Sequence, residues 1–97
     1  MSHRDYLIIL YDFYSELLTD KQKEYFEDYY FNNLSLSEIS ENLDVSRNAV
    51  HKSIKAIENK LIEYEDKLKL YKKNTQLKEI AEKIQDKNIK EKLEKLF

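Results

Sequence analysis

The fold is decided by residues 34–61, LSLSEISENLDVSRNAVHKSIKAIENKL. Ser35 and Glu38 make an S-x-x-E capping box, in which each side chain satisfies a free backbone donor at the start of a helix. After this short helix the chain breaks at Asp44-Val45, and Ser46 is the predicted N-cap of a second helix. Two short capped helices joined by so brief a turn are typical of the helix-turn-helix, whose second helix enters the major groove of DNA.

The second helix has an outward face rich in hydrogen-bond donors. No acidic residue occurs between Ser46 and Ile57, whereas a solvated helix face normally mixes both signs of charge. Such side chains contact base edges and phosphates. The alternative is that the pair is one corner of an ordinary helical bundle. The pattern favours a nucleic-acid-binding face, made of Ser46, Arg47, Asn48, His51, Lys52 and Lys55.

The composition predicts an all-α chain without enzymatic chemistry. The sequence holds no Gly, Pro or Cys, so it lacks the usual residues of hairpin turns, phosphate-binding loops and disulfides. His3 and His51 are isolated from other ligands, which makes a metal site unexpected. No cofactor is expected either. The first residues lack the pattern of a signal peptide or a membrane span, so we expect a soluble cytoplasmic protein without membrane contact.

Charge is divided unevenly along the chain. Residues 1–45 hold 3 basic and 10 acidic side chains, whereas residues 46–97 hold 14 basic and 9 acidic ones. Phosphate contacts dominate the affinity of proteins for nucleic acids. We therefore expect a polyanion to meet the second half, while the acidic half weakens and orients binding.

Two helices are predicted before the helix-turn-helix. The first is expected over Tyr6–Leu18, and a T-x-x-Q capping box from Thr19 to Gln22 opens the second. Aromatic residues are unusually frequent in both helices. Aromatic rings can stack on bases of single-stranded nucleic acids. At helical spacing and beside so much negative charge, they indicate a core instead.

Residues 18–61, which begin LTDKQKEYFEDYY and continue into the stretch quoted above, resemble region 4 of bacterial sigma factors. The segment from Tyr6 to Tyr71 is still more similar to the YlxM family, on the strength of LYDFYSELLTDKQKEYFEDYY, LSLSEISENLDVSRNAVHKSIKAIE and LIEYEDKLKLY. The resemblance implies a sigma-region-4-like helical bundle and a regulatory role connected with the signal recognition particle pathway. Asp44 departs from the Gly usual at this turn, but Asp tolerates a left-handed conformation.

The second motif helix is predicted to continue well past Leu61. An apolar seam continues in steps of four and three, which indicates one helix of about 25 residues. A first helix of about 13 residues is too short to cover it. Either a homodimer or a tail folded back over the seam could cover the remaining part, and the sequence favours both equally. The predicted dimer interface is Tyr64, Leu68 and Tyr71.

The division expected is a helix-turn-helix domain over residues 1–72 and a helical tail over 73–97. Asn74-Thr75 is predicted to break the seam and cap a new helix, and Asn88 to Glu91 is a weaker N-x-x-E cap. The expected apolar positions of the tail are Leu77, Ile80, Ala81, Ile84, Ile89, Leu93, Leu96 and Phe97.

Two functional classes follow from these observations. One is a regulator that binds duplex DNA through the donor-rich face of the second helix. The other is an accessory protein that uses the same surface for the RNA or the GTPase of the signal recognition particle. The residues favour the first class and the family resemblance favours the second.

Overall fold

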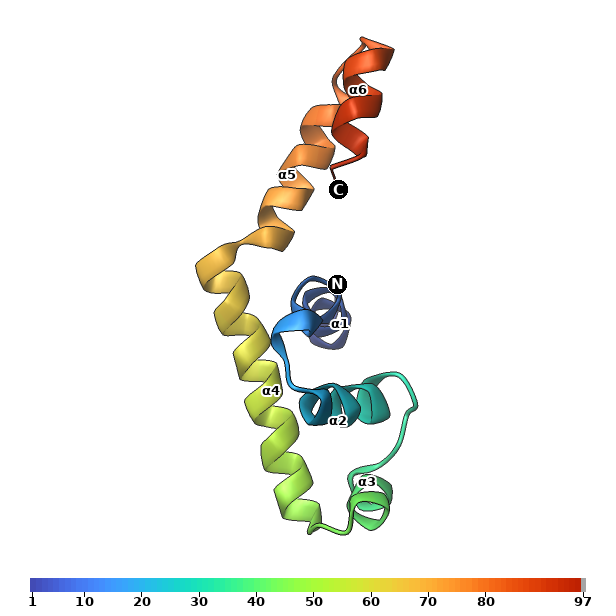
Figure 1. Ribbon diagram of the computed structural model, residues 1–97, viewed down its shortest axis with the longest axis vertical. Coiled ribbons are helices and arrows are strands. Elements are labelled where there is room, and N and C mark those ends of the chain that lie inside the picture. The colour runs from blue at the N-terminus through green and yellow to red at the C-terminus, as the bar shows by residue number, and fades with distance from the viewer. Residues whose placement is uncertain (97) are drawn as a thin grey trace.

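The computed structural model describes residues 1–96 and contains helices and connections but no strand within them. The all-α prediction is confirmed. The molecule is elongated, measuring 56 × 24 × 24 Å (Figure 1). Phe97, the last of the predicted tail positions, lies outside the described residues. The helices are α1 (His3–Tyr14), the 3-10 helix η1 (Ser15–Leu17), α2 (Asp20–Tyr30), α3 (Leu36–Leu43), α4 (Arg47–Leu68), α5 (Leu70–Glu82) and α6 (Lys87–Glu94).

Residues 1–68 form a compact unit, here called the body, in which three helices pack against α4. Helices α1, α2 and α3 all contact α4, which runs along one side of the body (Figure 1). The ring of Phe26 stacks on Tyr11 and Tyr30, with centroids 4.3 and 4.4 Å apart. The prediction that the aromatic residues form a core is therefore confirmed. The buried face of α4 is the predicted one: Val50, Ile54, Ile57 and Leu61, all at most 4% exposed.

The helix boundaries agree with the sequence in part: α1 begins at His3 and not at Tyr6, whereas α2 begins as predicted. Both halves of the Thr19–Gln22 capping box are present at α2, as predicted. The first helix, by contrast, ends at Tyr14 and not at Leu18, because the chain tightens into η1 before turning toward α2. The start of α2 has a capping box that the sequence shows, whereas the end of α1 has no such signal.

The prediction of one long helix through Tyr71 is wrong. Helix α4 ends at Leu68, and Lys69 adopts a left-handed conformation with φ of 57°. Tyr71 consequently belongs to α5, and its ring packs against Tyr6 and Phe13 of α1 at centroid distances of 6.0 and 5.9 Å. The turn at Lys69 thus brings Tyr71 back against α1, which partly covers it.

A buried pair of side chains joins the body to α5. The Tyr14 hydroxyl donates to Glu65 Oε1 over 2.6 Å and accepts the Leu70 backbone N–H. The Glu65 carboxylate also accepts the N–H groups of Tyr71 and Lys72, at 3.1 and 3.2 Å. The first N–H groups of a helix have no partner inside it. Tyr14 and Glu65, here called the joint, supply these partners and so compensate for the break.

Residues 70–96 form a second unit, here called the arm, in which α6 folds back along α5 (Figure 1). Asn74-Thr75 does not cap a helix, because α5 runs through it after starting at the joint. Asp86, and not Asn88, caps α6, since its carboxylate accepts the N–H groups of Asn88 and Ile89. The boundary expected between residues 72 and 73 falls within α5 and stays a prediction.

Candidate nucleic-acid interface

The α3–α4 turn has the local geometry that the sequence predicts. Ser35 Oγ accepts the Glu38 N–H over 3.1 Å, and the Glu38 carboxylate accepts the Ser35 N–H over 3.0 Å. These hydrogen bonds lower the pKa of Glu38. Asp44 closes α3 in the left-handed conformation, and Ser46 caps α4 by accepting the Ala49 N–H over 3.0 Å. The turn therefore delivers the first residues of α4 in a fixed direction.

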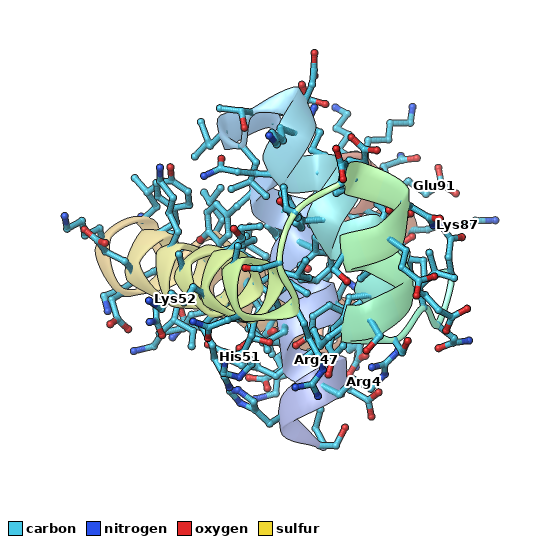
Figure 2. All side chains as sticks on the ribbon, turned by 90° about the horizontal axis from the view of Figure 1, so that it is seen from below. Arg4, Arg47, His51, Lys52, Lys87 and Glu91 are labelled. Atoms are coloured by element: carbon cyan, nitrogen blue, oxygen red, sulfur yellow. The ribbon has the colours of Figure 1, made fainter. Side chains whose placement is uncertain are left out.

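The side chains predicted to contact nucleic acid lie on the exposed surface of α4. Figure 2, seen from the end of the molecule that carries α3, shows Arg47, His51 and Lys52 on one side of the helix. Opposite this surface, the buried face of α4 fixes the rotation of the helix. We call the surface the donor face; it comprises Ser46, Arg47, Asn48, His51, Lys52 and Lys55, all exposed.

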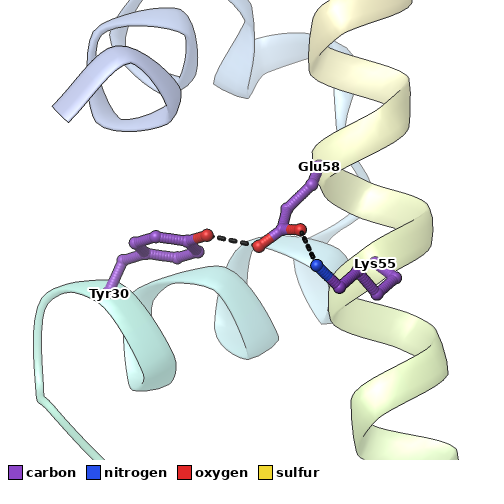
Figure 3. A network of polar contacts seen from close by, with 3 residues as sticks. All are labelled: Tyr30, Lys55 and Glu58. Atoms are coloured by element: carbon purple, nitrogen blue, oxygen red, sulfur yellow. Dashed lines mark hydrogen bonds and ion pairs between the residues drawn. The ribbon is translucent and has the colours of Figure 1, made fainter. Parts of the chain in front are cut away.

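Lys55 differs from the rest of the donor face because it has an intramolecular partner. Its Nζ lies 3.4 Å from Glu58 Oε1, and the other carboxylate oxygen of Glu58 accepts the Tyr30 hydroxyl (Figure 3). Burial and this hydrogen bond to Glu58 raise the pKa of Tyr30. The pair of Glu58 with Lys55 was not among the expectations from the sequence, although three residues apart is an ion-pair spacing. The pair leaves Lys52 and Arg47 as the cations of the donor face without an ion pair within residues 1–96.

Acidic side chains border the donor face on the α3 side. Glu38, Glu41 and Asp44 are all exposed on α3 and the turn that follows it. Like charges repel a phosphate backbone, so this border disfavours a polyanion lying across α3. The first turns of α4 therefore offer donors and positive charge beside an acidic flank.

Arg4 is a basic side chain with a structural role. Its Nη2 donates to the Tyr30 carbonyl over 2.7 Å and to Asn33 Oδ1 over 3.3 Å, and the guanidinium lies 4.9 Å from the Tyr30 ring centroid. These contacts hold the end of α2 and the following left-handed Asn33. The Arg4 side chain is therefore already held by contacts within the chain.

The requirements of a metal site and of a membrane-spanning helix are not met within residues 1–96. They contain no group of three or more His, Cys, Asp or Glu side chains placed to hold a metal ion. Within the same residues, no helix combines the length and apolar character that crossing a membrane requires.

Comparison with known proteins agrees with this geometry. Residues 1–96 match the model of the UPF0122 family, described as "Putative helix-turn-helix protein, YlxM / p13 like". The chain belongs to this family. A UPF0122 protein of Caldanaerobacter subterraneus subsp. tengcongensis is 51% identical over 81 residues, which cover 84% of this chain and 69% of that protein. The UPF0122 protein of Malacoplasma penetrans is 51% identical over 85 residues, covering 88% and 79%.

The UPF0122 match extends through both units of the molecule. The UPF0122 protein of Oceanobacillus iheyensis is 48% identical over 91 residues, covering 90% of this chain and 87% of that protein. The YlxM resemblance is therefore confirmed. It supports a helix-turn-helix protein, which the capped α3 and α4 provide.

The predicted dimer interface is divided by the turn at Lys69. The Tyr64 ring is half-buried and lies 5.9 Å from that of Tyr14, and Tyr71 is half-buried against α1. Leu68, at 44% exposed, is the most accessible of the three predicted residues. The length mismatch that motivated the dimer is absent, because α1 already covers Tyr64 and Tyr71. The interface itself stays a prediction.

Proposed function

We propose that this UPF0122 protein is a non-enzymatic, cytoplasmic regulator that binds duplex DNA through the donor face of α4. The observation that carries the proposal is the exposure of Arg47, Asn48, His51 and Lys52 on the first turns of a helix that α3 supports. Arg and Asn read guanine and adenine edges through paired hydrogen bonds, and Lys contacts phosphates.

The surroundings of the donor face favour an end-on approach. The start of α4 lies at one end of the long axis, with the arm at the other (Figure 1). The acidic border on α3 repels phosphates on one flank, so the duplex is expected to meet the opposite flank. The major groove of B-form DNA admits an α-helix, whereas the deep, narrow major groove of A-form RNA does not.

The test is fluorescence anisotropy with a short random-sequence DNA duplex and an RNA duplex of matching sequence. We expect binding to the DNA that weakens as salt rises. Lys52→Ala should lower the affinity and reduce the salt slope by about one unit for the lost phosphate contact. Lys55→Ala should have a smaller effect, because Lys55 already pairs with Glu58.

Lys87→Ala is the matched control. Lys87 is an exposed lysine at the start of α6, near the far end of the molecule, so its loss removes the same charge away from the donor face. Equal losses from Lys52→Ala and Lys87→Ala would show non-specific attraction. If Lys52→Ala bound DNA with unchanged affinity and salt slope, the donor face would not be the DNA-binding surface.

A second candidate function is an accessory role on the signal recognition particle, through its RNA or its GTPase. It is favoured by the acidic border of α3 and by the small number of unpaired cations on the donor face, which together limit phosphate contacts. The YlxM resemblance supports the same pathway. Co-purification from cells separates the two: recovered DNA supports the regulator, whereas recovered particle RNA or GTPase supports the accessory role.

A further inference from the structure

A groove lies where the arm leaves the body. It consists of two hollows, of about 570 and 320 Å³, which share Phe13 of α1 and Asn74 of α5. The larger hollow lies between α1 and α5 and is also lined by Tyr71. The smaller continues along the arm, where Leu70, Leu77 and Leu96 line it. Aromatic and aliphatic side chains therefore line the groove together with polar ones, among them Lys73, Asn74 and Thr75.

The arm lacks the core that would account for these apolar side chains. Ala81 is its one buried residue among those described, and Leu70 and Leu96 are 43% and 74% exposed. Soluble monomers rarely leave contiguous apolar surface uncovered, and such surfaces usually mark an interaction site. Two packed helices of this size also bury too little to be strongly stable alone. A surface that covers the groove would stabilise the arm.

The charges around the groove match a second copy of the same chain. Asp12 on α1 and Lys78 on α5 both line the larger hollow, and neither takes part in an ion pair within residues 1–96. The arm holds 8 lysines against 5 acidic residues, whereas the body holds 8 basic residues against 14 acidic ones. A two-fold axis places the same patch of both copies face to face. The basic arm of each copy then meets the acidic body of the other.

We infer that this groove is the seat of a second copy of the chain, with Asp12 of each copy facing Lys78 of the other. The inference does not rest on nucleic-acid binding, and it leaves the donor face free at the opposite end of the long axis. It also moves the expected interface. The contact surface is the groove between α1 and the arm, and not a continuous seam on α4.

The first test is sedimentation equilibrium of the full chain from about 1 µM to about 100 µM, beside Leu96→Glu. The wild type should dimerise, and Leu96→Glu should raise the dimer dissociation constant by more than about tenfold. Ile89→Glu is the matched control, because Ile89 is also exposed on α6, at 51%, but lines neither hollow. A monomeric wild type, or equal loss in both variants, overturns the inference.

The second test uses charge reversal and distinguishes this pairing from any other dimer. Asp12→Lys and Lys78→Glu should each weaken self-association, because each homodimer then opposes like charges twice. Mixed together, the two variants should form a heterodimer at least about tenfold more stable than either homodimer. Far-UV circular dichroism confirms that each variant is folded. Dimerisation that is unchanged in both variants, or the absence of heterodimer preference, overturns the proposed pairing.

Discussion

The body and the arm are both built of amphipathic helices, yet they differ in what covers their apolar faces. In the body, α4 contacts three other helices, and its apolar face is almost completely buried. In the arm, α6 packs chiefly against α5, and large aliphatic side chains of both helices remain exposed. Similar periodicity in sequence therefore leads to different burial, because burial depends on how many neighbours the fold supplies.

The joint explains how two such different units keep one relative direction. The carboxylate of Glu65, 7% exposed, accepts hydrogen bonds from Tyr14 of α1 and from the N–H groups of Tyr71 and Lys72 in the first turn of α5. These hydrogen bonds link the best-packed part of the molecule to the least-packed part, beside the packing of Tyr71 against Tyr6 and Phe13. The arm consequently has a defined start although its far end is thinly packed.

The largest expected effect that separates the two units is alkaline unfolding of the body. Burial and the hydrogen bond to Glu65 raise the pKa of Tyr14 to about 12, and burial and the nearby Glu27 raise that of Tyr11 to about 12. An unfolded tyrosine titrates near 10. Because the folded pKa is the higher one, this stabilisation is complete below pH of about 10 and is lost as the pH rises toward about 12.

Circular dichroism and phenolate absorbance recorded together measure this effect. We expect helix loss and late tyrosine ionisation to coincide between pH of about 10 and about 12. Complete ionisation near pH of about 10 with the helices intact would show that these phenols are not held in a packed core.

A smaller effect is expected from truncating matched isoleucines in the two units. Ile54 is 4% exposed in the body, whereas Ile80 is 55% exposed in the arm. Ile54→Ala should lower the free energy of unfolding by about 2–5 kcal/mol, because it leaves a cavity. Ile80→Ala should change it by less than about 0.5 kcal/mol. Denaturant unfolding of both variants measures this difference in the free energy of unfolding. Equal losses in the two variants would contradict the difference in packing between the body and the arm.

The smallest effect is expected at the joint. Glu65→Gln keeps the shape but replaces an acceptor oxygen by a donor, so one partly buried N–H loses its partner at a cost of about 1 kcal/mol. Amide hydrogen exchange at Leu70, Tyr71 and Lys72 should accelerate. Glu63→Gln is the control, since Glu63 pairs with Lys67 on the exposed surface of α4. Unchanged exchange in Glu65→Gln would mean that the joint does not hold the arm.

The local features of the helix-turn-helix could be predicted because their partners are close in sequence. The capping pairs at Thr19 and Ser35 join residues three apart, and Ser46 reaches Ala49 in the same way. The burial of Ile54 followed from helical spacing alone. The exposure of the donor-face side chains followed from the same spacing, since they lie opposite that buried stripe.

The features that could not be predicted involve partners far apart in sequence. Spacing shows which residues share a helix face, but it does not show where the helix ends. The regular seam suggested that α4 continues past Leu68, and the chain turns at Lys69 without the glycine that normally marks such a site. The burial of Glu58 and Glu65 was likewise invisible in a helix rich in charged residues.

The sequence by itself determined the all-helical class, the capped helix-turn-helix, the aromatic core and the membership of the UPF0122 family. Each depends on composition, on contacts within one helical turn, or on a pattern of many residues together. Only the tertiary structure decided the end of α4, the direction of the arm and the pairing of Lys55. These depend on Tyr14 meeting Glu65 across 51 residues and Tyr30 meeting Glu58 across 28, contacts that exist only once the helices have packed.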